Sequence, residues 1–365
     1  MKLIQFGAGN IGRSFVGQLF SKAGYEVVFI DIDNDIINAL NQKRSYNVEI
    51  RDYKNHIISV NNVRGINVQD TVAVINEIKN ADICATAVGP KILPKLYPIL
   101  AQGIKYRYKS NKNSLDIILC ENLRNAAHKT STGLKALLPP DFPLDTYIGL
   151  VETSIGKMVP IIPMTLRAND PLTVYAEAYN TLILDKKGFI NPVPDVHGLT
   201  PKDDMKAYVD RKSFIHNLGH ASLAYFARLV APEMIYTYEA IENPDLRHWV
   251  KQTMLESGRL LIKMYPGEFN EQNQEEHIED LLNRFGNRAL SDTIYRVGRD
   301  LNRKLSSEDR VAGPLLENQK NKLLCPWTAL TMACGLYFHA VPQDENPLAG
   351  DFEITQRAKI TGPES

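Results

Sequence analysis

Short apolar runs alternate with helical patterns over the first half of the chain. Apolar runs predict strands at 2–6, 26–32, 83–88 and 116–120, and the last two are rich in β-branched residues. Periodic patterns between them predict helices at 10–23 and 33–42, and the stretch 71–78 fits either a helix or a strand. Such alternation is typical of a parallel sheet with helices on both faces. We therefore predict an N-terminal α/β domain built on a doubly wound sheet.

The pattern changes after the middle of the chain. Strand-like stretches at 172–179 and 181–184 precede a segment rich in proline and glycine at 191–198, which is the best linker candidate. From residue 202 to residue 337 the pattern is that of long helices interrupted by prolines and a glycine. We therefore expect two domains: residues 1–193, with the sheet and its extra strands, and residues 194–365, an all-α C-terminal domain.

Composition limits the classes of partner. The 365 residues include 42 Lys+Arg and 42 Asp+Glu, so no overall charge attracts nucleic acid or an anionic membrane. A small-molecule partner fits this neutrality better. The start of the chain lacks the features of a signal peptide, and no apolar run approaches the ~18 residues of a membrane span. The 4 cysteines show no metal-binding spacing and read as buried thiols. We expect a soluble, cytoplasmic protein.

A glycine-rich turn follows the first predicted strand and opens a helix. Its residues, which match GxGxxG, are Gly7, Ala8, Gly9, Asn10, Ile11 and Gly12. In this context the pattern predicts a dinucleotide site, because the glycines permit a tight turn and the helix N-terminus faces the pyrophosphate. Asp31, 19 residues after Gly12, can accept hydrogen bonds from the adenosine ribose and would repel a 2′-phosphate. The predicted cofactor is therefore NAD(H) rather than NADP(H).

Three further residues are candidates for the same site. Arg13 either assists at the pyrophosphate or is a solvated residue of the first helical turn. Val88 and Gly89 lie at the end of a later strand, either at the sheet edge where such folds bind ligands or in an ordinary turn.

Lys212, Asn217 and His220 carry the candidate catalytic chemistry. In an α-helix, Asn217 lies about 140° and His220 about 80° from Lys212, so the three share one broad face. A neutral Lys212 would take the hydroxyl proton of an alcohol, Asn217 would donate to its oxygen, and His220 would orient the substrate or the lysine. The alternative is an amphipathic helix with ordinary polar residues. His216 and His220 are spaced as two zinc ligands, but without HExxH or a suitable acidic ligand we expect no metal.

These motifs resemble those of the polyol-specific long-chain dehydrogenases, and the resemblance covers nearly the whole chain. The matching stretches are FGAGNIGR at 6–13, TAVGP at 86–90, CEN at 120–122, the K-x4-N-x2-H pattern from residue 212, NRFGN at 283–287 and YRVGRDLNRKLSSEDR at 295–310. The resemblance implies a Rossmann domain with a helical domain, NAD, no zinc, and Lys212 as general base. It also implies that Asn122 joins Asn217 in holding the substrate oxygen; otherwise Asn122 caps a helix.

One stretch departs from the family's pattern. Where the family has V-D-R-[IV]-x-P, residues 155–160 read IGKMVP. The acidic residue, which in the family borders the substrate, is replaced by Gly156, and the arginine by Lys157, which lacks a planar fork. We keep Lys157 as a candidate substrate residue. Arg299 is another, within a basic stretch with Arg296, Arg303 and Lys304 that either meets a substrate anion or is solvated.

The expected function is that of an NAD(H)-dependent, metal-independent oxidoreductase. It would interconvert a sugar alcohol or sugar phosphate with its keto sugar, as does the branch of the family that acts on mannitol 1-phosphate. One alternative is a uronate reductase or aldonate oxidoreductase of the same superfamily. Another is an NAD-binding regulator that has lost catalysis, although such a protein has no chemical need for the four residues implicated in catalysis.

Overall fold

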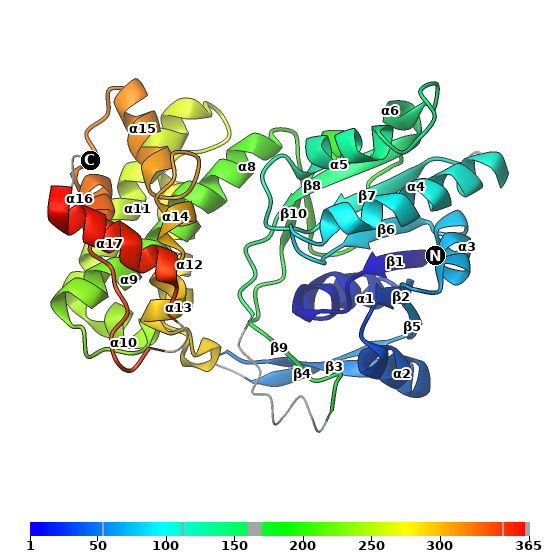
Figure 1. Cartoon of the computed structure of the whole chain (residues 1–365), viewed down its shortest axis with the longest axis horizontal. Helices are drawn as coiled ribbons and strands as arrows, with labels where there is room; N and C mark the ends of the chain where they lie inside the picture. The colour runs from blue at the N-terminus through cyan, green and yellow to red at the C-terminus, as the bar shows by residue number, and fades with distance from the viewer. Residues whose placement is uncertain (53–54, 111–112, 160–169, 345–346, 362–365) are drawn as a thin grey trace. The chain divides into compact units, whose positions relative to one another are not determined.

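The structure is a computed structural model that describes residues 1–52, 55–110, 113–159, 170–344 and 347–361 (Figure 1). It divides into two compact units, Met1–Met205 and Lys206–Ser365. The first unit extends beyond residue 193, the boundary expected from sequence. It does so because the short strand β11 (Leu199–Lys202) pairs in parallel with β10 (Leu182–Asp185).

The first unit is organised by a sheet with the strand order β11-β10-β8-β7-β6-β1-β2-β5. β1 (Lys2–Phe6) pairs in parallel with both β2 (Glu26–Asp31) and β6 (Ile83–Thr86). β5 (Val63–Asn67), β7 (Leu115–Leu119) and β8 (Ile148–Ser154) continue the parallel arrangement, and β10 is antiparallel to β8. The predicted α/β fold of this unit is confirmed.

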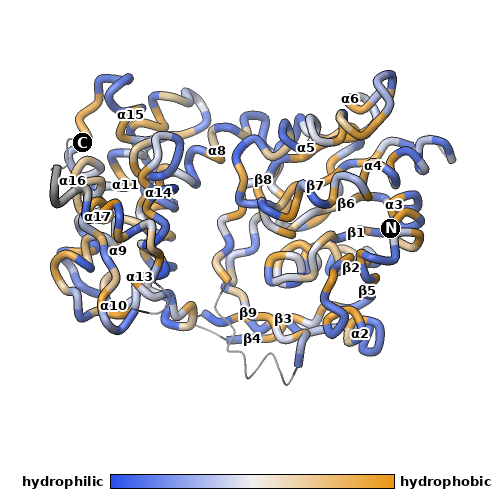
Figure 2. The backbone as a smooth tube through the Cα atoms, viewed as in Figure 1, coloured by the Kyte–Doolittle hydropathy of each residue, from blue (hydrophilic) through white to orange (hydrophobic). Residues whose placement is uncertain are grey.

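Alternate residues of the central strands pack into cores on opposite faces of the sheet. In β2, Val27 and Phe29 join one core, whereas Val28 and Ile30 join the other. One core includes the helix that follows β1; the other includes α3 (Thr71–Lys79) and α4 (Leu93–Ser110). Because both faces are covered, most positions in the middle of these strands are apolar (Figure 2). The remaining helices of this unit are α2 (Asn34–Lys43), α5 (Ala126–Lys135), α6 (Leu144–Tyr147) and the short η2 (Lys186–Gly188).

A smaller sheet has the order β4-β3-β9. β3 (Ser45–Ile50) pairs antiparallel with β4 (His56–Asn61) and parallel with β9 (Val174–Ala176). The side chains of Tyr46, Val48 and Ile50 alternate inward. The Tyr46 hydroxyl donates a 2.7 Å hydrogen bond to the carbonyl of Arg13, which ties this sheet to the helix after the glycine turn.

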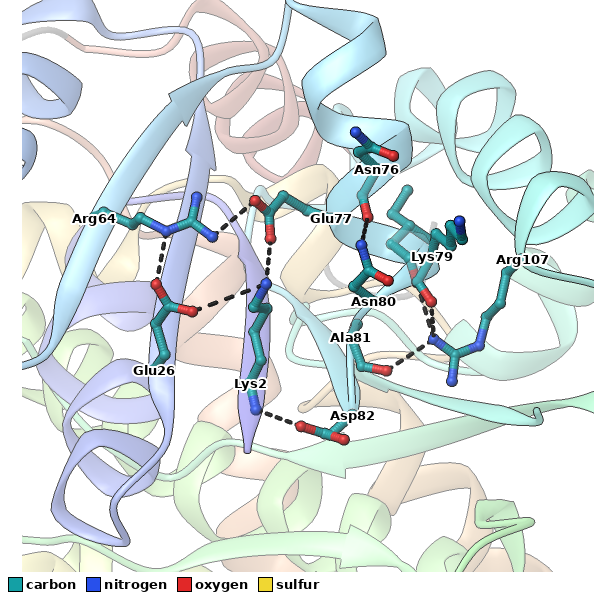
Figure 3. Close-up of polar contacts among 11 residues, drawn as sticks. Lys2, Glu26, Arg64, Asn76, Glu77, Lys79, Asn80, Ala81, Asp82 and Arg107 are labelled. Atoms are coloured by element: carbon teal, nitrogen blue, oxygen red, sulfur yellow. Dashed lines mark hydrogen bonds and ion pairs between the residues drawn. The ribbon is translucent and has the colours of Figure 1, made fainter. Parts of the chain in front are cut away.

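Paired charges close the edge of the main sheet formed by the amino ends of its parallel strands (Figure 3). Arg64 donates at 2.7 Å to both Glu26 and Glu77, and Lys2 donates at 2.9 Å to Glu77. Arg107, on α4, donates to backbone carbonyls at and beyond the end of α3. The predicted ligand-binding residues lie at the opposite edge of the sheet, which is formed by the carboxyl ends of the parallel strands.

The second unit is helical, which confirms the predicted all-α fold. A helical stretch runs through α8 (Met205–Arg211), η3 (Lys212–Asn217) and α9 (Leu218–Val230). α9 contacts α11 (Pro244–Met264), α13 (Ile294–Gly298) and α16 (Pro326–Leu336), and α12 (Glu271–Phe285) contacts α11. The other helices are α10 (Thr237–Glu242), η4 (Arg288–Leu290), α14 (Leu301–Lys304), α15 (Ala312–Lys320) and α17 (Ala349–Thr361).

Candidate active site

The turn after β1 contains two glycines that cannot carry a side chain and a third that faces open space. Gly7 has a φ of 92°, and a Cβ there would lie 2.5 Å from the carbonyl oxygen of Ala87. A Cβ on Gly12 would lie 2.0 Å from the carbonyl oxygen of Gly7. A Cβ on Gly9 would meet no atom of the described chain within 4 Å. Gly7 and Gly12 are thus needed to form the turn, while Gly9 leaves the backbone open to a ligand.

Asp31 joins this turn to the carboxyl end of β2. Its Oδ2 accepts a 2.6 Å hydrogen bond from the amide of Ala8, and its Oδ1 accepts a 2.7 Å bond from the amide of Ile32. The cap of α2 is Asp33, not Asp31. Asp31 also borders a cavity of about 460 Å³ whose wall includes Gly7, Gly9, Val68, Val88 and Leu96. A carboxylate therefore lies in the wall of a largely apolar cavity beside the glycine turn.

Asn10 and Ile11 begin the helix that follows the turn. The Oδ1 atom of Asn10 is buried and, within the described residues, has no hydrogen-bond partner. Arg13 is fully buried, which makes the alternative of a solvated residue wrong. Its Nε donates at 2.7 Å to the carbonyl of Ala8 and its Nη1 donates at 3.1 Å to the carbonyl of Pro171. These bonds hold the backbone of the glycine turn from inside the protein.

Val88, Gly89 and Asn122 follow two adjacent parallel strands, β6 and β7, at their carboxyl ends. Gly89 has a φ of 88°, and a Cβ there would meet no described atom within 4 Å. Asn122 is exposed, and the N-cap of the next helix, α5, is Asn125. The alternative of Asn122 as the cap of that helix is therefore wrong.

The departure from the family's pattern lies next to the helix after the glycine turn. Lys157 is buried; its Nζ donates at 3.1 Å to Asn180 and lies 5.1 Å from the centre of the Phe15 ring. A Cβ on Gly156 would lie 3.5 Å from the ring of Tyr179, an ordinary contact distance. Pro160, the last residue of the pattern, lies outside the described residues.

Lys212 and Asn217 are the first and last residues of a π-helical segment, η3. The amide of Leu218 donates to the carbonyl of Ser213, five residues earlier. In such a segment residues five apart lie nearly above one another, whereas in an α-helix they lie about 140° apart. The predicted uninterrupted α-helix is therefore wrong here. The wider winding brings Lys212 and Asn217 closer together around the helix axis than the prediction allowed.

Burial distinguishes the three predicted catalytic side chains from their neighbours. Lys212, Asn217 and His220 are partly exposed, whereas residues 213–216 and 218–219 are buried. A solvated amphipathic helix would expose a broad polar face. Between residues 212 and 220, the partly exposed positions are the three at which an amine, an amide and an imidazole occur.

The surroundings of Lys212 favour its neutral form. Burial, assisted by the charge of Arg310 and opposed by that of Asp309, lowers the pKa of Lys212 to about 8. Arg310 itself is paired with Asp309 at 2.7 Å. An amine with such a pKa is partly neutral near neutral pH, as a general base must be.

The surroundings of His220 keep its imidazole in the neutral form. Its ring stacks on Phe285, in the NRFGN stretch, with centroids 4.7 Å apart and planes 7° apart. Its Nε2 lies 3.7 Å from the buried Asp292, which also pairs with Arg296. Burial, followed by nearby positive charges, lowers the pKa of His220 to about 3. The imidazole is therefore neutral and can donate one hydrogen bond and accept another.

Over the described residues, no group of three or more His, Cys, Asp and Glu side chains is arranged to hold a metal ion. None of the helices in that part of the chain is both long and apolar enough to span a membrane.

Comparison with known proteins assigns the chain to a family. The family model of the mannitol dehydrogenase Rossmann domain matches residues 1–198, and that of the mannitol dehydrogenase C-terminal domain matches residues 204–355. The chain belongs to the mannitol dehydrogenase family. It is 36% identical over 317 residues to a mannitol-1-phosphate 5-dehydrogenase from Geobacillus stearothermophilus, covering 86% of this chain and 81% of the relative. The predicted family and the predicted class of enzyme, a dehydrogenase, are confirmed.

Solved structures share the fold at low identity. A mannitol 2-dehydrogenase from Pseudomonas fluorescens, solved as a ternary complex with NAD and D-mannitol, has a TM-score of 0.76 at 15% identity over 98% of this chain and 83% of its own. A D-sorbitol dehydrogenase has a TM-score of 0.77 at 16% identity, over 92% of this chain and 79% of its own. These likenesses confirm the fold.

Positive charges gather around His220 in the helical unit. Arg296, Lys304 and Arg310 each lower the pKa of His220. Burial, followed by Arg310, lowers the pKa of Lys304 to about 7, and its Nζ donates to the carbonyl of Val297. Arg299, which the sequence offered as a candidate substrate residue, is partly buried, and its charge contributes to lowering the pKa of Arg296. Within the predicted basic stretch, Lys304 is thus the residue buried near His220.

Sequence reasoning did not select several residues that the structure places at these sites. Lys304 and Arg296 were named only as part of a basic stretch; they belong to two different helices, α14 and α13. Arg310 was not considered, because its effect on Lys212 depends on contacts between distant segments. Glu121 was treated only as a letter of the CEN element, and its burial could not be read from local sequence.

Proposed function

We propose that this chain is a metal-independent, NAD-dependent dehydrogenase that interconverts a phosphorylated sugar alcohol and its keto sugar. Family membership supports the reaction class, and the relative from Geobacillus stearothermophilus supports a phosphorylated polyol as substrate. The observation that carries the proposal is Lys212. Desolvation lowers the pKa of its amine to about 8, and its side chain shares a partly exposed face with Asn217 and His220.

The residues at the carboxyl edge of the sheet fit NAD. Gly9 leaves its backbone open, the Asn10 Oδ1 atom is buried without a described partner, and Asp31 borders the cavity beside them. The Asp31 carboxylate would accept hydrogen bonds from the adenosine ribose, since a carboxylate has more acceptor sites than the three described amide bonds use. When bound, NAD⁺ supplies the hydride acceptor for alcohol oxidation.

The catalytic residues would divide the remaining work between them. As the alcohol carbon loses its hydride, the neutral Nζ of Lys212 accepts the proton of the hydroxyl group. The side-chain amide of Asn217 donates a hydrogen bond to the alcohol oxygen, which stabilises its developing negative charge. The family resemblance implies the same role for Asn122. His220, held neutral by burial, orients a substrate hydroxyl. In the reverse reaction the Lys212 ammonium returns the proton to the carbonyl oxygen.

An anionic group on the substrate would meet the cations around His220. Lys304 is a suitable partner, because it is buried and an anion would repay the cost of burying its charge. Arg296 offers a guanidinium beside the buried Asp292. These cations also suit a carboxylate, so a uronate or aldonate is the second candidate substrate. The replacement of an acidic residue by Gly156 leaves both candidates open.

A substrate screen tests the proposal. We expect NADH oxidation to be fastest with fructose 6-phosphate, slower by at least about 10² with fructose, because each charge-assisted hydrogen bond contributes ~1.5–3 kcal/mol, and slow with fructuronate and tagaturonate. Faster turnover of a uronate would support the second candidate. Absence of turnover with all four, despite NADH binding, would support a regulator.

Metal removal tests the other half of the proposal. Because an amine serves as base, activity should survive exhaustive treatment with EDTA. A loss of activity that zinc restores would contradict the assigned role of Lys212.

A further inference from the structure

Glu121 buries a carboxylate between the ends of two strands that carry candidate site residues. Its side chain is 4% exposed. One carboxylate oxygen accepts a 2.7 Å hydrogen bond from the hydroxyl of Thr86, the last residue of β6. The other accepts a 3.1 Å bond from the amide of Val88. Glu121 itself follows β7 and directly precedes Asn122 in the chain.

The buried carboxylate of Glu121 needs hydrogen-bond donors in place of water. A carboxylate removed from water is costly unless donors replace its solvent. Burial raises the pKa of Glu121, whereas the hydroxyl of Thr86 and the amides of Val88 and Gly89 act in the opposite direction. The ionised form only accepts hydrogen bonds, which matches a set of backbone and hydroxyl donors. A backbone hydrogen bond also connects the ends of β6 and β7, because the amide of Cys120 donates at 2.8 Å to the carbonyl of Thr86.

The two segments that Glu121 connects have different ligands in the proposed function. Val88 borders the cofactor cavity, and Gly89 turns with a positive φ into open space. Asn122 would hold the substrate oxygen. We propose that Glu121 is a positioning residue that fixes the Val88–Gly89 turn relative to Asn122. This inference rests on the proposed roles of those residues.

A nearby carboxylate provides a matched control. Glu152, on β8, is also partly buried, and burial raises its pKa. It accepts a 3.4 Å hydrogen bond from the amide of Ala126 at the start of α5, and its described bonds do not reach the Val88–Gly89 turn. Removing Glu152 therefore tests the loss of a buried carboxylate at the same sheet edge without disturbing the proposed connection.

Four variants of the full chain test this role: Glu121→Ala, Glu121→Gln, Thr86→Val and Glu152→Ala. For each, the Kd of NADH and the Tm are measured, together with kcat at saturating NADH. Glu121→Ala should raise the Kd about tenfold and lower kcat about tenfold, since two bonds to a charged group are lost. Thr86→Val, which removes one donor, should shift both quantities in the same direction by less.

Rescue separates positioning from a general packing role. In Glu121→Gln the amide oxygen can accept from Val88 while the amide nitrogen donates to Thr86, so Kd and kcat should return to within about threefold. Glu152→Ala should lower the Tm and leave both quantities unchanged. If Glu121→Ala and Thr86→Val lower only the Tm, Glu121 is structural and the inference is wrong. The NADH titration does not depend on the substrate, so an inactive wild-type protein that binds NADH would refute the proposed function alone.

Discussion

Two helices of this protein contain π-helical segments with the same spacing of key residues but different side chains. In η1 (Gly12–Gly17), positions five apart are both glycine, and all six residues are buried. In η3, positions five apart are Lys212 and Asn217, and both are partly exposed. A Cβ on Gly17 would lie 2.6 Å from the ring of Phe29. The same winding therefore brings backbone against a sheet in one helix and aligns polar side chains in the other.

The comparison separates two uses of one backbone geometry. Residues five apart lie nearly above one another in a π-helical turn. Where both are glycine, the helix can approach its neighbours closely, and Tyr46 bonds to a carbonyl of that segment. Where they are lysine and asparagine, two functional groups share a face. Changes in η1 should therefore affect folding and cofactor binding, whereas changes in η3 should affect turnover.

The largest effect is expected in η3. Lys212→Ala should lower turnover by about 10²–10⁴-fold, the usual contribution of a general base, and leave the Kd of NADH nearly unchanged. In the unmodified protein, alcohol oxidation should increase as pH rises through about 8, because only the neutral amine accepts a proton. That ionisation should be absent from the pH–rate profile of the variant.

A surface lysine supplies the control for this variant. Lys251, on α11, pairs with Glu279 and is partly exposed, so Lys251→Ala should leave turnover within about twofold. A Lys212→Ala protein that keeps more than about a third of normal turnover, against the loss expected of a true base, would return η3 to a packing role.

In η1 the corresponding change should disrupt structure. Gly12→Ala places a methyl group against the carbonyl of Gly7, and we expect the free energy of unfolding to fall by about 1–3 kcal/mol and NADH binding to be lost. Gly9→Ala adds the same group in open space, so it should keep the Tm and weaken only NADH binding. Thermal melts measure the Tm of each variant, and NADH titrations measure its affinity for the cofactor. Equal Tm values for the two variants would contradict the packing assigned to η1.

A smaller effect distinguishes the two polar residues of η3. Asn217→Ala should lower turnover about 10–10²-fold, because one hydrogen bond to a developing negative charge is lost. The rise of activity with pH should remain, because an amide does not titrate. If the variant loses that rise, Asn217 acts through the ionisation of Lys212 instead of through the substrate oxygen.

The smallest effect concerns cofactor choice at the carboxyl end of β2, beside the glycine turn that precedes η1. NADH should bind more tightly than NADPH, and Asp31→Ala should reduce the difference, because the carboxylate beside Ala8 repels a 2′-phosphate. Titrations with both nucleotides measure the difference. Equal or tighter binding of NADPH to the unmodified protein would remove Asp31 from this role.

The strands with continuous apolar sequence were predictable. The prediction for β1 matches its observed bounds, that for β2 differs by one residue at the carboxyl end, and that for β7 differs by one residue at each end. The strands β3, β4 and β5 were not predicted. Their exposed faces interrupt the apolar pattern, and β4 has a single fully buried residue, Val60. Helix α4 was missed as well, and it contains Pro98, which in a sequence usually indicates a break.

What the sequence determined by itself is local. Gly7 follows from the positive φ of the turn and Gly12 from its close contact with the carbonyl of Gly7, and the K-x4-N-x2-H spacing places three functional groups within about two turns of helix. Desolvation and pairing, by contrast, depend on residues distant in sequence. The pKa of Lys212 reflects burial and Arg310, Arg13 is buried against Pro171, and Glu121 meets a strand more than thirty residues away. Tertiary structure decided these features, because only packing sets which charges lose their water and which donors replace it.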